Sequence, residues 1–256
     1  MVTGVLPVAL EEATKALPIF IYSGKEYVCL MQLHEDLPEE DIRKILEEFT
    51  GEIYQKPPVR ASVKRTIRKR RIYRINLLEI DGRRVLFKVA CQAGTYIRKL
   101  CSDIGEALGC GAHMRELRRT RTGPFTEDEH NCTLQELQEA KRRLTEEDDE
   151  QMLRIMIRPV EEAFKHIPKI YVRDSAVDAI CHGAELAIPG IVRLETGIEP
   201  EEPVAIMTLK GEVVALGEAT MSTEKIMEAD RGIAAKTRRV IMRAGTYPKE
   251  WKGRGR

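Results

Sequence analysis

The sequence predicts an α+β protein, with a mixed, mainly antiparallel sheet and flanking helices followed by a small β-rich domain. Two strand-forming segments, residues 75–80 and 85–90, are joined by Asp81-Gly82, a dipeptide typical of tight hairpins. Amphipathic helical spacing occurs on both sides of this hairpin, and from Ile170 onward the segments become short and β-rich. With 256 residues and 43% hydrophobic content, the chain can build a core for each of two domains.

The segments before the hairpin alternate between strand and helix. Residues 27–33, YVCLMQL, predict a strand that follows a turn at residues 23–24. Residues 38–49 predict a helix, because acidic residues stand at its start and apolar residues recur on one face. Residues 55–60, QKPPVR, contain two successive prolines, so we expect an extended loop there.

The segment after the hairpin is the most informative part of the chain. Residues 94–98, GTYIR, read as an extended strand, which puts Tyr96 and Arg98 on one face, where a flat ring and an anion could be held together. Residues 102–108 then predict an amphipathic helix that two glycines, at 109 and 111, bring to an end.

The remaining elements follow in the second half of the chain. Residues 133–143 predict a helix that begins with a capping box, a threonine followed three residues later by glutamate. Residues 151–157 predict another helix. Residues 204–209 and 213–219 read as a hairpin with a Lys-Gly turn, in a separate β domain of independent folding size.

Local basic clusters predict contacts with phosphate. The net charge is only +1 although 32% of the residues are charged, so any basic surface must come from local segregation. One such run has no acidic residue and holds basic residues at positions 60, 64, 65, 68, 69, 70, 71 and 74. A second holds Arg115, Arg118, Arg119 and Arg121. A solvated strand face is the alternative for either run alone, but two runs around one hairpin favour nucleic acid.

Other function classes find little support in the sequence. The six cysteines include no CxxC pair and no nearby histidine partners, so we expect neither disulfides nor a metal site. The residues after Met1 are too short and uncharged for a signal peptide, and no apolar run reaches membrane-spanning length. We therefore expect a cytoplasmic protein without a membrane partner.

Several motifs in order resemble the TruB family of pseudouridine synthases. The resemblance lies in GTYIR, AHM and LRRTRxGPF within residues 94–125, in QKPPVRASVKR, and in VTGVLPVALEEATK at residues 2–15. DSAVDAICHGAELAIPGI at residues 174–191 resembles the start of a PUA domain, a small β-barrel. The pattern is most similar to the archaeal and eukaryotic dyskerin branch, which works in box H/ACA particles. The resemblance implies a catalytic domain over residues 1–165 and a PUA domain over residues 166–256.

The resemblance also implies roles for individual residues. Isomerising uridine to pseudouridine requires the nucleotide to be flipped into a pocket. Tyr27, in a KxY strand, matches the tyrosine that stacks on the target base and takes a sugar proton. Arg98 matches the arginine that pairs with the catalytic aspartate, and Tyr96 lines the same pocket. No metal or cofactor is implied, since the base itself leaves and returns as nucleophile.

A wider set of residues is expected to contact RNA. The catalytic part contributes Arg60, Lys64, Arg65, Arg68, Arg118, Arg119 and Arg121, and the PUA part contributes His182, Gly183, Ala184, Gly190 and Lys252. The glycines would let the backbone approach a nucleotide closely, although turn formation explains each of them equally well. The implied partners are a box H/ACA guide RNA, a substrate rRNA, small basic accessory proteins and a kink-turn binding protein.

One departure from the family pattern concerns the nucleophile. In the family, VTGVLP follows GGTLDPK or a close variant, and the aspartate of that motif attacks the sugar. Here Met1 stands before Val2, and none of the aspartates lies in that motif. We therefore expect a shortened chain that is inactive alone. Two alternatives are a non-catalytic RNA-binding scaffold and a standalone tRNA synthase, the latter branch usually carrying tyrosine in place of Arg60.

Overall fold

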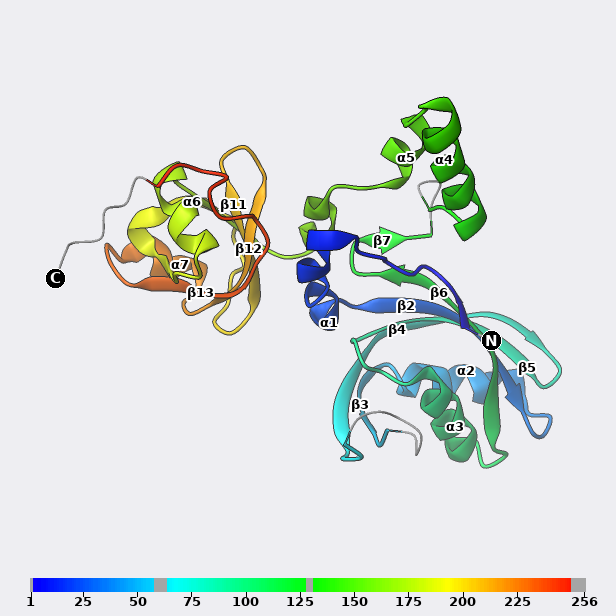
Figure 1. Ribbon diagram of the computed structural model, residues 1–256. Coiled ribbons are helices and arrows are strands. Elements are labelled where there is room, and N and C mark those ends of the chain that lie inside the picture. The colour runs from blue at the N-terminus through cyan, green and yellow to red at the C-terminus, as the bar shows by residue number, and fades with distance from the viewer. Residues whose placement is uncertain (1, 58–63, 128–130, 250–256) are drawn as a thin grey trace. The chain divides into compact units, whose positions relative to one another are not determined.

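The computed structural model describes residues 2–57, 64–127 and 131–249. Their contacts divide the chain into two compact units. The first comprises Met1–Pro7 and Phe20–Asn131, and the second comprises Val8–Ile19 and Cys132–Arg256. Figure 1 shows the sheet and helices of each unit, and each unit is described by itself.

The described part of the first unit is built on a seven-stranded sheet in the order β1-β6-β2-β5-β4-β3, with β7 paired to β6. Its strands are β1 (Val2–Gly4), β2 (Lys25–Leu33), β3 (Gly51–Gln55), β4 (Arg68–Asp81), β5 (Arg84–Cys91), β6 (Ala112–Thr122) and β7 (Phe125–Thr126). The β1–β6 pair is parallel and the other pairs are antiparallel. The sheet is therefore mixed and mainly antiparallel, and the α+β fold class is confirmed.

Two helices cover one face of this sheet (Figure 1). They are α2 (Glu39–Glu48) and α3 (Ile97–Ala107), and a short helix, α1 (Ile19–Tyr22), precedes β2. The core between sheet and helices contains the fully buried side chains of Met31, Phe87 and Leu100. Because alternate residues of a strand face opposite sides, this core fixes which residues of β2, β5 and β6 face the helices.

Most sequence-based elements of this unit are confirmed. The hairpin joins β4 to β5, and Gly82 adopts a positive φ of 52° in its turn. The strand at residues 27–33 and the helix at residues 38–49 correspond to β2 and α2 within two residues at each end.

The prediction of an extended GTYIR strand is wrong. Helix α3 begins at Ile97, so Tyr96 is its extended N-cap residue and Arg98 lies in its first turn. Ile97, Leu100 and Ile104 are buried together, which shows that the apolar helical spacing starts five residues before the predicted helix. Tyr96 and Arg98 therefore do not share a strand face.

The second unit contains a sheet that, among the described residues, has six strands in the order β10-β8-β11-β12-β13-β9. They are β8 (Lys169–Val172), β9 (Leu186–Ala187), β10 (Ile191–Leu194), β11 (Pro203–Thr208), β12 (Val213–Ala219) and β13 (Ile233–Val240). Its helices are α4 (Leu134–Glu147), α5 (Gln151–Met156), α6 (Asp174–Cys181) and α7 (Thr223–Glu228), with 3-10 turns at Glu11–Ala16, Val160–Phe164 and Ile188–Gly190. The predicted hairpin at residues 204–219 is β11 and β12, and the helix at residues 151–157 is α5.

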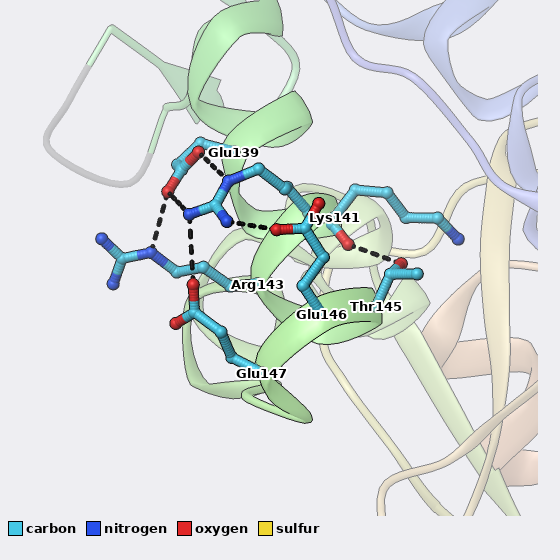
Figure 2. Close-up of polar contacts among 7 residues, drawn as sticks. Glu139, Lys141, Arg143, Thr145, Glu146 and Glu147 are labelled. Carbon is cyan, nitrogen blue, oxygen red and sulfur yellow. Dashed lines mark hydrogen bonds and ion pairs between the residues drawn. The ribbon is translucent and has the colours of Figure 1, made fainter.

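Helix α4 begins with the predicted capping box. The backbone N–H of Glu136 donates to the Thr133 hydroxyl, and the Glu136 carboxylate accepts from the Thr133 backbone at 2.6 Å. Later in the helix, Arg142 donates to three carboxylates, and Glu139 accepts from two arginines (Figure 2). The carboxylates around Arg142 are Glu139, Glu146 and Glu147. None of the helices in the described ranges combines the length and apolarity needed to cross a membrane.

Candidate functional site

Tyr27 lies on the face of β2 that is turned toward the helices. Cys29 and Met31 follow it on the same face and are fully buried, and the Tyr27 ring packs against this core from the end of the strand. The ring is half-buried. Burial raises the pKa of the Tyr27 phenol, while the positive charge and hydrogen bonding of Arg119 oppose this rise. The phenol is therefore held neutral, with its hydroxyl beside a cation.

Arg119 contacts Tyr27 from the neighbouring strand. In the β2–β6 ladder Tyr27 stands opposite Arg119, so the two side chains lie on the same face of the sheet. The Nε of Arg119 donates a hydrogen bond of 2.6 Å to the backbone carbonyl of Val5. The guanidinium therefore connects β2, β6 and the segment that follows β1.

The N-terminal strand approaches β6 very closely at Gly4. A Cβ placed on Gly4 would stand 2.1 Å from the carbonyl oxygen of Arg119, and Gly4 has a positive φ of 99°. Only glycine fits this position without moving the backbone of one of the two strands. The close approach brings Val5 to the Arg119 guanidinium, with the Val5 N–H donating to the Arg119 carbonyl at 2.8 Å.

Lys25 and Cys91 form the adjoining part of the site. The Nζ of Lys25 donates to the carbonyls of Phe20 and Ser23 at 2.8 and 3.0 Å. Burial lowers the pKa of Lys25, and the charge of Arg119 adds to this effect. Cys91 stands opposite Lys25 in the β2–β5 ladder, and burial raises the pKa of its thiol to about 11. The Cys91 thiol is therefore uncharged at neutral pH.

Tyr96 is positioned by a buried glutamine. Gln55, at the end of β3, is 1% exposed. Its Oε1 accepts from the Tyr96 N–H at 3.0 Å, and its Nε2 donates to the Tyr96 carbonyl at 3.2 Å. The Thr95 hydroxyl donates to the Gln92 carbonyl at 2.7 Å and lies close enough to Cys91 to oppose the rise in the pKa of its thiol. Cys91 in turn helps to raise the pKa of Tyr27. The turn that contains Thr95 and Tyr96 therefore lies next to the part of the sheet that carries Tyr27.

Arg98 is available for a further partner. It is exposed in the first turn of α3, and it has no hydrogen-bond or ion-pair partner among the described residues. The structure thus places Tyr27 on β2, and Tyr96 and Arg98 at the start of α3, a helix that packs against β2 and β6. Sequence reasoning missed Gln55, Cys91 and Lys25, and the only local signal was the position of Lys25 in the KxY motif.

The other basic residues predicted in the first unit have different surroundings. Arg60 lies outside the described residues, Lys64 and Arg65 are exposed before β4, and Arg68 is half-buried in β4. Arg118 is exposed and pairs with Glu127. Arg121 is half-buried, close enough to Glu26 to help lower the pKa of that carboxyl.

Three of the residues predicted in the second unit share an open pocket of about 530 Å³ at the end of α6. His182, Gly183 and Ala184 line it together with Asp178 and Lys249. The Nδ1 of His182 donates to the Asp178 carbonyl at 2.7 Å, and Gly183 has a positive φ of 89°. Lys249 is the basic side chain of this pocket, and it lies there beside Asp178 and the carboxyl-terminal end of α6.

The two remaining predictions of the second unit do not line this pocket. Gly190 packs beside Ala176 and Leu186, and Lys252 lies outside the described residues. Within residues 2–57, 64–127 and 131–249, no cluster of three or more histidine, cysteine or acidic side chains could hold a metal ion.

Comparison with protein families accounts for nearly the whole chain. Residues 1–97 match the TruB family pseudouridylate synthase N-terminal domain, residues 98–165 match the tRNA pseudouridylate synthase B C-terminal domain, and residues 168–241 match the PUA domain. A protein of Methanopyrus kandleri named "Probable tRNA pseudouridine synthase B" is 58% identical over 98% of this chain and 74% of its own length. The chain belongs to the TruB family. This confirms the resemblance found in the sequence motifs, and the family is one of RNA pseudouridine synthases.

Solved structures of TruB-family proteins have the same fold. One, described as "Crystal Structure of a Cbf5-Nop10-Gar1 Complex", is 52% identical with a TM-score of 0.93, over 97% of this chain and 75% of that chain. Another, described as "Structure of H/ACA RNP bound to a substrate RNA containing 2'-deoxyuridine", is 50% identical with a TM-score of 0.89, over 98% and 76%. A homologous protein from Methanocaldococcus jannaschii, also named "Probable tRNA pseudouridine synthase B", is 55% identical over 98% of this chain and 74% of its own length.

Proposed function

We propose that this chain takes part in the isomerisation of uridine to pseudouridine in rRNA, and also in tRNA, at positions chosen by a box H/ACA guide RNA. The observation that carries the proposal is the similarity, over 98% of this chain, to a protein solved in an H/ACA particle with substrate RNA. The exposed basic residues before β4 and the pocket at the end of α6 provide separate places for phosphate contacts.

In the proposed mechanism Tyr27 stacks on the flipped target base. Its ring lies at the end of the buried face of β2, and its neutral phenol adds no charge that would repel RNA. Arg98 is free to pair with a carboxylate, which would keep that carboxylate ionised and oriented. Tyr96, whose backbone is held by Gln55 at the start of α3, lines the proposed pocket for the flipped base.

We further propose that residues 1–165 serve catalysis and residues 166–256 hold the guide RNA. The pocket of His182, Gly183 and Ala184 is the proposed place for the ACA end, because Gly183 and Ala184 leave the backbone accessible beside Lys249. Small basic proteins and a kink-turn binding protein complete the proposed particle. The solved relatives in complexes with Nop10 and Gar1 support the small protein partners.

Binding to the ACA end can be tested directly. A guide RNA with an intact ACA should bind residues 1–256 more tightly than the same RNA with the trinucleotide mutated. Each specific base contact contributes about 1–3 kcal/mol, so we expect roughly a tenfold loss or more. Equal affinity for both RNAs would contradict the assignment of the pocket.

A turnover assay tests whether this polypeptide can catalyse the reaction by itself. None of the aspartates among residues 1–256 lies in the motif that the family uses, so we propose that this polypeptide alone binds RNA without converting it. The measurement is tritium release from 5-tritiated uridine in a substrate RNA, with guide RNA present. Release above background would refute the proposed inactivity. Release that needs no guide would favour a second candidate, a standalone tRNA synthase, which the names of the curated relatives support.

A further inference from the structure

We propose that Arg119 is a positioning residue, whose guanidinium ties the Tyr27 side chain to the backbone of Val5 and thereby fixes the tyrosine ring. The proposal deepens the proposed function and rests on it for the stacking role of Tyr27. In the sequence Arg119 belongs to a run of arginines in β6, and the proposal gives it a different role from the others.

The register of the sheet separates Arg119 from Arg118. Val28 stands opposite Arg118 and Tyr27 stands opposite Arg119, so these two successive arginines project from opposite faces of β6. Arg118 is exposed and pairs with Glu127. Arg119 is half-buried on the face that carries Tyr27. A run of arginines in the sequence therefore divides into a surface residue and a residue of the site.

The contacts of Arg119 show what its side chain does. Its Nε is committed to the Val5 carbonyl at 2.6 Å, and its charge and hydrogen bonding act on the Tyr27 phenol. Gly4 allows β1 to lie directly on the Arg119 backbone, which brings the Val5 carbonyl within reach. One guanidinium thus joins β2, β6 and the segment that follows β1 at the tyrosine, because its planar donors can serve two acceptors at once.

Lys25 strengthens the case against a phosphate-gripping role. Its ammonium lies near enough to Arg119 for the two like charges to influence each other, yet Lys25 is already bound to two backbone carbonyls. Both cations are therefore used to hold backbone around Tyr27. A residue whose purpose is to attract phosphate would keep its donors free toward solvent.

The first experiment reads the Tyr27 hydroxyl in the full chain. Biosynthetic 3-fluorotyrosine replaces the tyrosines, and the Tyr27 fluorine resonance is assigned by its loss in Tyr27→Phe. In Arg119→Gln we expect Tyr27 to titrate at higher pH than in the parent chain, because a cation and a hydrogen bond to the phenolate are removed. Arg115→Gln, on the same strand and bonded instead to Gln32, should leave the titration unchanged. An unchanged Tyr27 titration in Arg119→Gln would overturn the proposal.

The second experiment separates positioning from phosphate contact. We expect Arg119→Gln to change the affinity for guide RNA by less than about twofold, with the same dependence on salt concentration. A phosphate contact predicts instead that the slope of log affinity against log salt falls by about 0.7–0.9, and that result would overturn the proposal. If the chain bound no H/ACA RNA, the proposed function would fail, while the fluorine titration would still decide the role of Arg119.

A third measurement does not depend on the stability of Arg119→Gln. The Nε–H of Arg119 in the unaltered chain should exchange with solvent much more slowly than that of Arg115, because it is bonded to Val5. Arg119→Lys and Arg115→Lys, which keep the charge, assign the two nitrogen resonances. Equal exchange rates would contradict the bond on which the proposal depends.

Discussion

Gln55 holds the backbone of Tyr96 through both its carbonyl oxygen and its amide nitrogen. Since the glutamine is 1% exposed, its removal leaves the Tyr96 N–H and carbonyl without these partners. We expect Gln55→Ala to lower the free energy of unfolding by about 2 kcal/mol. Urea unfolding measures this change, and Gln138→Ala, at an exposed position of α4, serves as the control with little expected effect. A similar small effect for both variants would show that Gln55 does not fix the Tyr96 turn.

At the residue scale the sequence predicts the site through motifs alone. Tyr27, Tyr96 and Arg98 could be singled out because they stand in recognisable patterns. Gln55 could not be singled out, because it bonds a residue 41 positions further along the chain. Cys91 could not be singled out either, because its place beside Lys25 depends on how two strands pair. Arg119 could be seen only as one of a basic run, since strand register decides which face each arginine occupies.

Helix α3 illustrates the same limit for a whole element. Its end was predictable, because Gly109 and Gly111 adopt positive φ values of 76° and 73° after the last turn. Its start was not, because aromatic and β-branched residues in GTYIR favour a strand locally. The buried face formed by Ile97, Leu100 and Ile104 overrides this preference by packing against the sheet. Strands and helices with strong periodicity, such as β2 and α2, carried no such conflict.

Close packing of α3 on β6 gives a prediction for this element. A Cβ on Gly105 would stand 2.1 Å from the backbone nitrogen of Ala112, so Gly105→Ala must push the helix away from the strand. We expect a loss of about 3 kcal/mol in the free energy of unfolding, measured by denaturant titration. Gly24→Ala is the matched control, because its Cβ would meet the Tyr73 ring at an ordinary 3.5 Å. Equal stability of the two variants would contradict the close approach of α3.

Helix α4 should depend on pH through its own carboxylates. Arg142 and Arg143 lower the pKa of Glu139 to about 2 from its ordinary value of 4.5, and the bonds from Thr133 lower the pKa of Glu136. Both groups have a lower pKa in the helix than in the unfolded chain, so their contribution is present above pH 4.5 and is lost as the pH falls toward 2. Circular dichroism of a peptide spanning residues 131–149 should show helicity falling over this range. A peptide with Glu139→Gln and Glu136→Gln should show a smaller fall in helicity, because only the pairs of Arg142 with Glu146 and Glu147 remain. A fall as large as that of the parent peptide would refute these assignments.

For the molecule as a whole, charge is distributed so that a nearly neutral protein can bind a polyanion. The net charge is +1, so attraction to RNA must come from local cations whose phosphate contacts release counterions. Lys64, Arg65 and Arg68 stand together where the chain enters β4, and the first two are exposed. Replacing all three with glutamine should reduce the slope of log affinity against log salt by about 2–3.

The same substitution elsewhere on the first unit decides whether location matters. Arg43 and Lys44 on α2, with Arg84 on β5, are exposed, and two of them are already paired with carboxylates. Their triple replacement with glutamine changes the net charge by the same amount, yet it should leave the salt slope of guide-RNA binding nearly unchanged. Equal slopes for the two triple variants would mean that overall charge attracts the RNA. A lower slope confined to the variant with replacements before β4 would show that this segment makes the phosphate contacts.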